Sequence, residues 1–194
     1  TQQVDPSGAF SISTMADTSA TSVTVGHGLS AAPSMYIVKS YSGSSTWGIY
    51  HKSIGATKNL NLNTTAGEGT SSSYFNDTEP TSSVLSLGAS WNGAGTLVVY
   101  AFADIEGYCK AGAYTGNGDA DGPFVYTGFR PALVTTKRAT VSTGGYLVHD
   151  NARDTYNPSI EIVQWNSDQP EFNSANDRVD FLANGFKVRS SNGG

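Results

Sequence analysis

Residues 96–103, with the sequence Thr-Leu-Val-Val-Tyr-Ala-Phe-Ala, carry the strongest indication of fold class in this chain. β-Branched and aromatic residues dominate the run, and apolar side chains occupy both of its alternating faces. A strand with one face in water would instead alternate polar and apolar residues. The run therefore predicts a central β-strand that is covered on both sides, and its lack of a 3.6-residue period argues against a helix.

Short β-branched or alternating runs continue from this strand toward both ends of the chain, and turn-forming residues separate them every few positions. None has a sustained helical period, so each is expected to be a strand bounded by turns. About ten to twelve such strands are typical of an all-β fold, an antiparallel β-sandwich of jelly-roll or concanavalin-like type. The other expected strands are residues 22–25, 34–38, 47–51, 60–63, 84–88, 124–127, 132–136, 146–149, 160–165, 179–182 and 186–189.

The chain has 194 residues, enough to bury a core without disulfides or metals. We expect one β-sandwich domain over residues 10–194, preceded by a polar linker or docking segment over residues 1–9. A weak internal repeat runs through this domain. Residues 33–39 and 131–137 both begin with Pro and end with Lys, at an offset of 131 − 33 = 98, and residues 47–51 match 146–150 at an offset of 99. The pattern indicates either a duplicated hairpin or a chance similarity.

The composition narrows the classes of partner. With a single cysteine, Cys109, the chain cannot form an intrachain disulfide. Charged residues make up only 14% of the chain and the formal net charge is −5, a composition that suits a rigid extracellular or virion module packed against identical neighbours and is equally typical of solitary lectin-like domains. No basic run is interleaved with aromatic residues, so nucleic acid is not expected as a partner. No apolar stretch approaches the roughly 20 residues that cross a bilayer, so membrane insertion is not expected either.

Two acidic residues, Asp104 and Glu106, follow the central strand and would share a face if the strand continued. Jelly-roll glucanases carry a Glu-x-Asp-x-Glu run, and this stretch resembles its last three positions. Phe102 stands where the first carboxylate, the nucleophile, is required. Because the paired-carboxylate mechanism needs both groups, we interpret the acids as a solvated strand end or a salt-bridged turn, and we do not expect an enzyme.

Residues 117–122, Asn-Gly-Asp-Ala-Asp-Gly, resemble the opening half of a calcium-binding loop. Asn117, Asp119 and Asp121 would present side-chain oxygens at alternating positions, the ligands that Ca²⁺ prefers. The twelfth position is Gly128 instead of the bidentate Glu of an EF-hand. The same residue types build ordinary tight turns, so calcium binding and a plain loop are both open, and no other cofactor is expected.

Three aromatic residues, Trp47, Trp91 and Tyr146, are the predicted ligand-binding side chains, and they lie in stretches that contain glycine, such as Trp91-Asn92-Gly93 and Gly145-Tyr146. An exposed ring beside amide and carboxylate groups suits a sugar, because the C–H face of a pyranose stacks on the ring. The alternative is that these residues belong to the core, as most Trp and Tyr residues in a sandwich do.

Several stretches together resemble a module of the virion structural and tail-fibre proteins of marine bacteriophages, an uncharacterised, lectin-like family. The resemblance lies in residues 25–29, Pro33, Lys39, and residues 47–51, 101–131 and 180–187. It implies a virion protein, on the extracellular particle, that serves as a fibre or appendage module. Expected partners are other copies of the chain, as a homotrimer or larger homo-assembly, other virion proteins, and a host-surface glycan used in attachment. The resemblance assigns no functional residue.

Two other functions stay open from the sequence. A purely structural subunit that assembles with itself, such as a capsid decoration, tail or filament protein, would have the same low surface charge. A polysaccharide depolymerase would require the incomplete carboxylate set at Asp104 and Glu106 to act in catalysis.

Overall fold

The computed structural model describes residues 1–16 and 20–190. The regular secondary structure is almost entirely antiparallel β-sheet, with 36% of residues in strands and 4% in helices, so the predicted all-β class is confirmed. It divides into two compact units, where the sequence had indicated one domain over residues 10–194. The first unit comprises Thr1–Ile105 and Cys109–Gly112, and the second comprises Glu106–Tyr108 and Ala113–Gly194.

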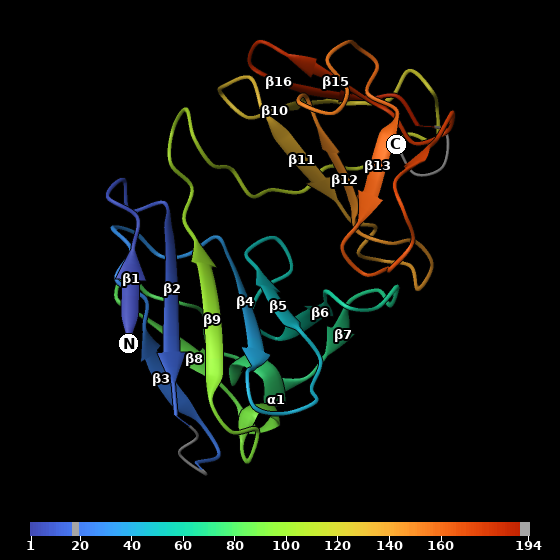
Figure 1. Ribbon diagram of the computed structural model, residues 1–194. Coiled ribbons are helices and arrows are strands. Elements are labelled where there is room, and N and C mark those ends of the chain that lie inside the picture. Colours follow the sequence, from blue (N-terminus) through green and yellow to red (C-terminus); the bar gives the residue numbers. More distant parts are fainter. Residues whose placement is uncertain (17–19, 191–194) are drawn as a thin grey trace. The chain divides into compact units, whose positions relative to one another are not determined.

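The first unit is a sandwich of a large and a small sheet (Figure 1). The large sheet has the strand order β1-β2-β9-β4-β5-β6-β7, and the small sheet pairs β3 with β8. The large sheet consists of β1 (Gln2–Val4), β2 (Phe10–Met15), β4 (Met35–Ser40), β5 (Gly48–His51), β6 (Lys58–Asn61), β7 (Gly69–Thr70) and β9 (Leu97–Phe102). The other elements are β3 (Val23–Gly26), β8 (Val84–Leu87), the helix α1 (Ser72–Phe75) and the 3₁₀ turn η1 (Ala89–Trp91).

The core of this unit lies between the two sheets, and its centre is a cluster of three aromatic rings. Tyr36 on β4 and Tyr50 on β5 stack with their ring centroids 4.7 Å apart. Phe75 on α1 meets both rings edge-on, at 5.2 and 5.9 Å. The Ser71 side chain caps α1 by accepting a hydrogen bond from the Ser73 N–H, and this short helix places Phe75 in the core, where it is fully buried.

The central strand predicted over residues 96–103 is β9, which pairs with β2 on one side and β4 on the other. On one face of β9, Leu97, Val99 and Ala101 are buried against the small sheet. On the other face, Val98, Tyr100 and Phe102 are only half-buried. The expectation that both faces are covered is therefore wrong. On the second face β9 is shielded by neighbours in its own sheet, such as Phe10, whose ring centroid lies 4.8 Å from that of Phe102.

Residues 1–9, expected to be a linker or docking segment, contain an edge strand of the first unit. β1 pairs antiparallel with β2, and the Gln2 side-chain amide donates a hydrogen bond to the Gly26 carbonyl at 3.0 Å. Gly28 has a positive φ of 66°, and a Cβ at this position would lie 2.8 Å from the Val4 side chain. Glycine at position 28 therefore allows β1 to close over the turn that follows β3.

The second unit is a smaller sandwich of a four-stranded sheet, β11-β12-β13-β14, and a three-stranded sheet, β10-β16-β15 (Figure 1). Its strands are β10 (Phe124–Tyr126), β11 (Leu133–Thr136), β12 (Leu147–Asp150), β13 (Glu161–Gln164), β14 (Phe172–Asn173), β15 (Val179–Leu182) and β16 (Gly185–Val188). Val134 of the first sheet packs with apolar residues of β15 and β16. This cluster holds five buried residues in the described part of the chain, against 14 in the first unit, so the second unit has the smaller core.

The hairpin repeat indicated by the sequence is present, one copy in each unit. Met35 of β4 pairs with His51 of β5, and Leu133 of β11 pairs with Asp150 of β12. The strands therefore correspond at offsets of 133 − 35 = 98 and 150 − 51 = 99, the offsets found in the sequence. The two hairpins therefore share one register of backbone pairing, as the duplicated-hairpin interpretation requires.

The correspondence extends to strands that the sequence did not reveal as repeated. Lys58 of β6 pairs with Thr70 of β7, and Glu161 of β13 pairs with Asn173 of β14, both at an offset of 103. The antiparallel pair of β3 with β8 in the first unit corresponds to the antiparallel pair of β10 with β16 in the second. Equivalent polar contacts hold the turns, since Trp47 N–H donates to Asn63 Oδ1 at 3.1 Å and Tyr146 N–H donates to Asn166 Oδ1 at 2.7 Å. Each unit is therefore built on one shared set of six strands.

The aromatic cluster makes a prediction for stability. Phe75→Ala removes a fully buried ring from contact with Tyr36 and Tyr50 and should lower the free energy of unfolding of the first unit by about 3–5 kcal/mol. The control is Tyr41→Ala, which truncates a ring that is 79% exposed. Urea unfolding followed by tryptophan fluorescence measures both. Equal, small effects of the two variants would contradict the placement of Phe75 in the core.

Candidate functional site

A pocket in the second unit has a volume of about 480 Å³, within the usual range for ligand sites. The start of β15, the end of β16 and the loop before β13 form its walls. Its lining residues are Ala120, Asn157, Pro158, Arg178, Asp180 and Arg189. Two guanidinium groups, one carboxylate and one amide thus line a single pocket.

Strand pairing brings the two arginines together. β15 and β16 form a hairpin in which Val179 pairs with Val188, and the next pair outward is Arg178 and Arg189, whose N–H donates to the Arg178 carbonyl at 2.8 Å. Residues directly opposite each other place their side chains on the same face of a sheet. Two like charges in this relation destabilise a hairpin unless anionic groups lie close to them.

One of the two arginines is neutralised within the chain. Arg189 Nε donates to Asp180 Oδ2 at 2.7 Å, and its Nη1 donates to Asp121 Oδ1 at 2.8 Å. Lys187 Nζ lies 3.0 Å from the same Asp121 oxygen. The hydrogen bond from Lys187 and its charge, together with Arg189, lower the pKa of Asp121 below its usual value. The Asp121 carboxylate therefore remains ionised near neutral pH, and the contacts with Asp121 and Asp180 fix the position of Arg189.

Arg178 differs from Arg189, because its Nε is buried and makes no hydrogen bond to the described part of the chain. A buried guanidinium N–H without an acceptor costs free energy, and an anion in the pocket would remove that cost. The guanidinium fork matches a carboxylate, with which it forms two parallel hydrogen bonds. The site is therefore suited to a ligand that carries a carboxylate.

Next to Arg178, a loop held by Asn157 forms part of the wall. The Asn157 amide donates to the Phe181 carbonyl at 3.1 Å, and its oxygen accepts the Phe181 N–H at 2.9 Å, so this side chain fastens the loop to β15. The Asn157–Pro158 peptide bond is cis. Tyr156, directly before Asn157, is 83% exposed. An exposed aromatic ring thus adjoins the loop that lines the pocket.

The residues predicted to bind calcium form a turn in the structure. Asn117 Oδ1 accepts the Asp119 N–H at 3.1 Å, and Asp119 Oδ1 accepts the Asp121 N–H at 2.8 Å. Asp121 faces Arg189 and Lys187. Across residues 1–16 and 20–190, no group of three or more His, Cys, Asp or Glu side chains is arranged to hold a metal. The described contacts are those of the plain-loop alternative, and calcium binding stays a prediction.

The predicted sugar-stacking residues are placed differently from the expectation. Trp91 is 3% exposed and donates from Nε1 to the Tyr74 carbonyl at 2.9 Å, and Tyr146 is 4% exposed. Neither ring has a free face, because each packs in the interior of its unit, so the expectation is wrong for these two residues. Trp47 is half-buried in the first unit, and its role in binding stays a prediction. The sequence analysis missed Arg178, Arg189 and Tyr156, since only the register of β15 with β16 brings the two arginines together.

Asp104 forms the salt-bridged turn that was one interpretation of the acidic pair. Its carboxylate accepts hydrogen bonds from Lys52 Nζ at 2.5 Å and the Ala111 N–H at 2.8 Å, and Lys110 Nζ lies at 3.1 Å. Partial burial opposes ionisation, but these contacts outweigh it and lower the pKa of Asp104 to about 2. A general acid must hold a proton near neutral pH, and this carboxylate does not.

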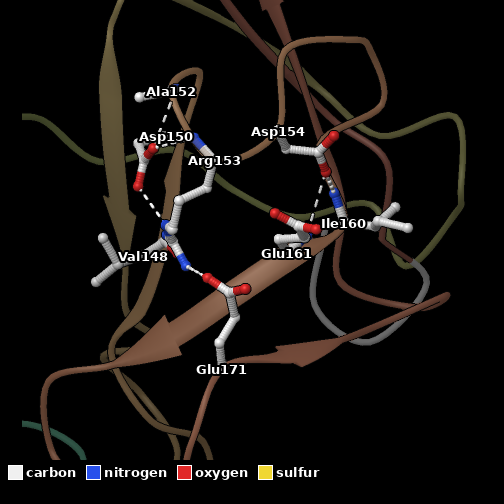
Figure 2. A network of polar contacts seen from close by, with 8 residues as sticks. All are labelled: Val148, Asp150, Ala152, Arg153, Asp154, Ile160, Glu161 and Glu171. Atoms are coloured by element: carbon white, nitrogen blue, oxygen red, sulfur yellow. Dashed lines mark hydrogen bonds and ion pairs between the residues drawn. The ribbon is translucent and has the colours of Figure 1, made fainter.

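A second polar network braces the turn after β12 (Figure 2). Arg153 donates from Nε to Asp150 Oδ2 and from Nη1 to Glu171 Oε2, both at 2.6 Å. Asp154 accepts the Ile160 N–H at 2.6 Å. Arg153 pairs with both Asp150 and Glu171, and these contacts fix the turn after β12 against the loop leading to β14.

Comparison with known proteins gives one match. The family described as "Domain of unknown function (DUF7483)" has a model that matches residues 1–194. The chain belongs to this family. No curated protein and no solved structure matches. Among the helices of the DUF7483 chain, none in the described ranges has the length and apolar character needed to span a membrane.

The low pKa of Asp104 predicts how stability depends on pH. The folded-state pKa of about 2 lies below the unfolded value of 3.8, so the ion pairs stabilise the fold above pH 3.8 and lose this effect as the pH falls toward 2. Asp104→Asn should cost about 1 kcal/mol at pH 7, because Lys52 and Lys110 are 40% and 45% exposed and solvent screens them.

Urea unfolding at pH 7, 4 and 2.5 checks this prediction. The difference between the wild type and Asp104→Asn should shrink at the lowest pH, whereas Asp168→Asn, a change at an exposed carboxylate, should behave like the wild type throughout. A difference that stays constant with pH would show that the Asp104 carboxylate does not act through its charge.

Proposed function

We propose that this chain is a bacteriophage virion protein, a fibre or appendage module on the extracellular particle that attaches to an acidic host-surface glycan. The observation that carries the ligand class is the pair of guanidinium groups, Arg178 and Arg189, that line one pocket, where the buried Nε of Arg178 has no hydrogen-bond partner in the described ranges. The virion assignment is supported by the resemblance to marine phage modules and by a surface with few charges.

The chemistry of the pocket favours a sugar acid as the ligand. Arg178 forms two hydrogen bonds with the ligand carboxylate, and Arg189, whose charge Asp180 and Asp121 balance, is held in a fixed position beside it. The exposed ring of Tyr156 supplies an apolar surface for the sugar face. Attachment of this kind binds the glycan without breaking it, and the carboxylate of Asp104, ionised by its ion pairs, is not available as an acid catalyst.

A purely structural role is the second candidate, and one observation favours it. β11 is an edge strand whose outer side is unpaired in the described part of the chain. A subunit of a larger homo-assembly uses such edges to contact its neighbours.

The test of attachment is binding to a panel of uronic-acid oligosaccharides and to the same oligosaccharides with each carboxylate reduced to an alcohol. We expect binding to the acidic forms, weakened by salt, and no binding to the reduced forms. Arg178→Gln should lower the affinity at least tenfold, since a charge-assisted hydrogen bond contributes about 1.5–3 kcal/mol.

The matched control is Arg130→Gln, which removes one exposed positive charge from the same unit outside the pocket. The melting temperature without ligand separates function from folding. Arg178→Gln should leave it unchanged or raise it, because the like charge opposite Arg189 is removed. Equal affinity of Arg178→Gln and wild type, or no binding to any acidic glycan on the panel, would overturn the proposal.

A further inference from the structure

β11 ends the four-stranded sheet of the second unit, and the hydrogen-bond pattern shows which backbone groups face outward. The Asn151 N–H donates to the Ala132 carbonyl at 3.0 Å, so the next residue to bond to β12 on this strand is Val134. The N–H and C=O groups of Leu133 and Thr135 therefore point away from β12. No strand of the described ranges pairs with them.

The first unit shows what fits at this edge. β4, the counterpart of β11, has β5 on one side and β9 on the other. Met35 and Ile37, which correspond to Leu133 and Thr135, pair with Phe102 and Tyr100 of β9. In the first unit, this edge of the hairpin therefore pairs with an antiparallel strand that carries apolar residues. In the second unit, no strand of the described ranges occupies the corresponding position beside β11.

The edge also lacks the features that keep edge strands apart. Natural sheets protect such strands with a charge, a proline or a bulge. Leu133–Thr136 contains none of these, and Leu133 is 53% exposed. The four paired residues themselves carry no charge, and the nearest positive charges are Arg130, Lys137 and Arg138 beyond the two ends of the strand.

We propose that β11 pairs with β11 of a second copy of this chain, antiparallel, about a two-fold axis that passes between the two Val134 residues. Leu133 of each copy then lies opposite Thr135 of the other, and each such pair exchanges both of its backbone hydrogen bonds. The strand is self-complementary, as a two-fold interface requires. The two four-stranded sheets become one continuous sheet.

The side chains of β11 are also compatible with this two-fold pairing. Val134 faces the apolar cluster of the second unit, so the two Val134 side chains meet on the inner side of the joined sheet and extend both small cores. Two strands of four residues bury far less than the roughly 1,200 Å² of a standard interface, so the dimer is weak and depends on concentration. This interface does not involve the Arg178 pocket, so it holds or fails independently of glycan binding.

Sedimentation equilibrium from about 10 μM to 1 mM tests the association. The average mass of the wild type should rise with concentration toward twice the monomer mass. Leu133→Lys should keep the protein monomeric, because it places two ammonium groups at the β11–β11 interface. The control Val141→Lys adds the same charge at a residue that is 40% exposed in the loop between β11 and β12, and it should associate like the wild type. A second variant, Thr135→Pro, removes an outward N–H and leaves the bonds to β12 in place, so it should also weaken the dimer.

A crosslink tests the two-fold register. In a Cys109→Ser background, Val134→Cys should form an intermolecular disulfide, because residues facing each other without hydrogen bonds have Cα atoms about 4.5 Å apart, within disulfide range. Val141→Cys should not. A monomer at 1 mM overturns the proposal, as does association that Leu133→Lys leaves unchanged. Association that is lost in Leu133→Lys but gives no disulfide in Val134→Cys, or masses beyond the dimer, contradicts the two-fold pairing.

Discussion

Backbone pairing between β4 and β5, repeated between β11 and β12, is the constraint on which both units depend. Because side chains alternate across a strand, this register decides which residues enter the core. Tyr36 is opposite Tyr50 in the first unit, and Val134 is opposite His149 in the second. A slip of one residue in either hairpin would move these pairs to the outer face. Four further strands of each unit, which correspond between the units at nearly constant offsets, build on this frame.

The two units share the same set of paired strands but differ in the side chains that these strands position. In the first, the Gly88 N–H donates to the Tyr74 carbonyl, and Trp91 packs against Tyr74 in the core. At the equivalent place in the second unit the Arg189 N–H donates to the Arg178 carbonyl. Equivalent positions thus contribute to core packing in the first unit and line a charged pocket in the second unit. The Arg178 pocket is therefore a property of the second unit and is not inherited from the shared fold.

The sequence predicted what depends on local patterns. Alternation and turn residues gave the all-β class, the apolar run at residues 96–103 gave a central strand, and the spacing of Pro and Lys gave the duplicated hairpin. The sequence did not predict the features that depend on which residues become neighbours in the folded chain. Trp91 and Tyr146 looked like binding residues because glycines flank them, yet both are buried. The Arg178 pocket depends on the pairing of β15 with β16, and that register has no signal in the local sequence.

The shared register is tested most directly by nuclear Overhauser effects between Hα protons in solution. Residues that face each other without hydrogen bonds bring these protons close, and the account assigns Ile37 with Ile49 and Thr135 with Val148 to this class. We expect strong cross-peaks for both pairs. A cross-peak from Thr135 to a neighbour of Val148 instead, or its absence in the second unit alone, would contradict a duplicated frame.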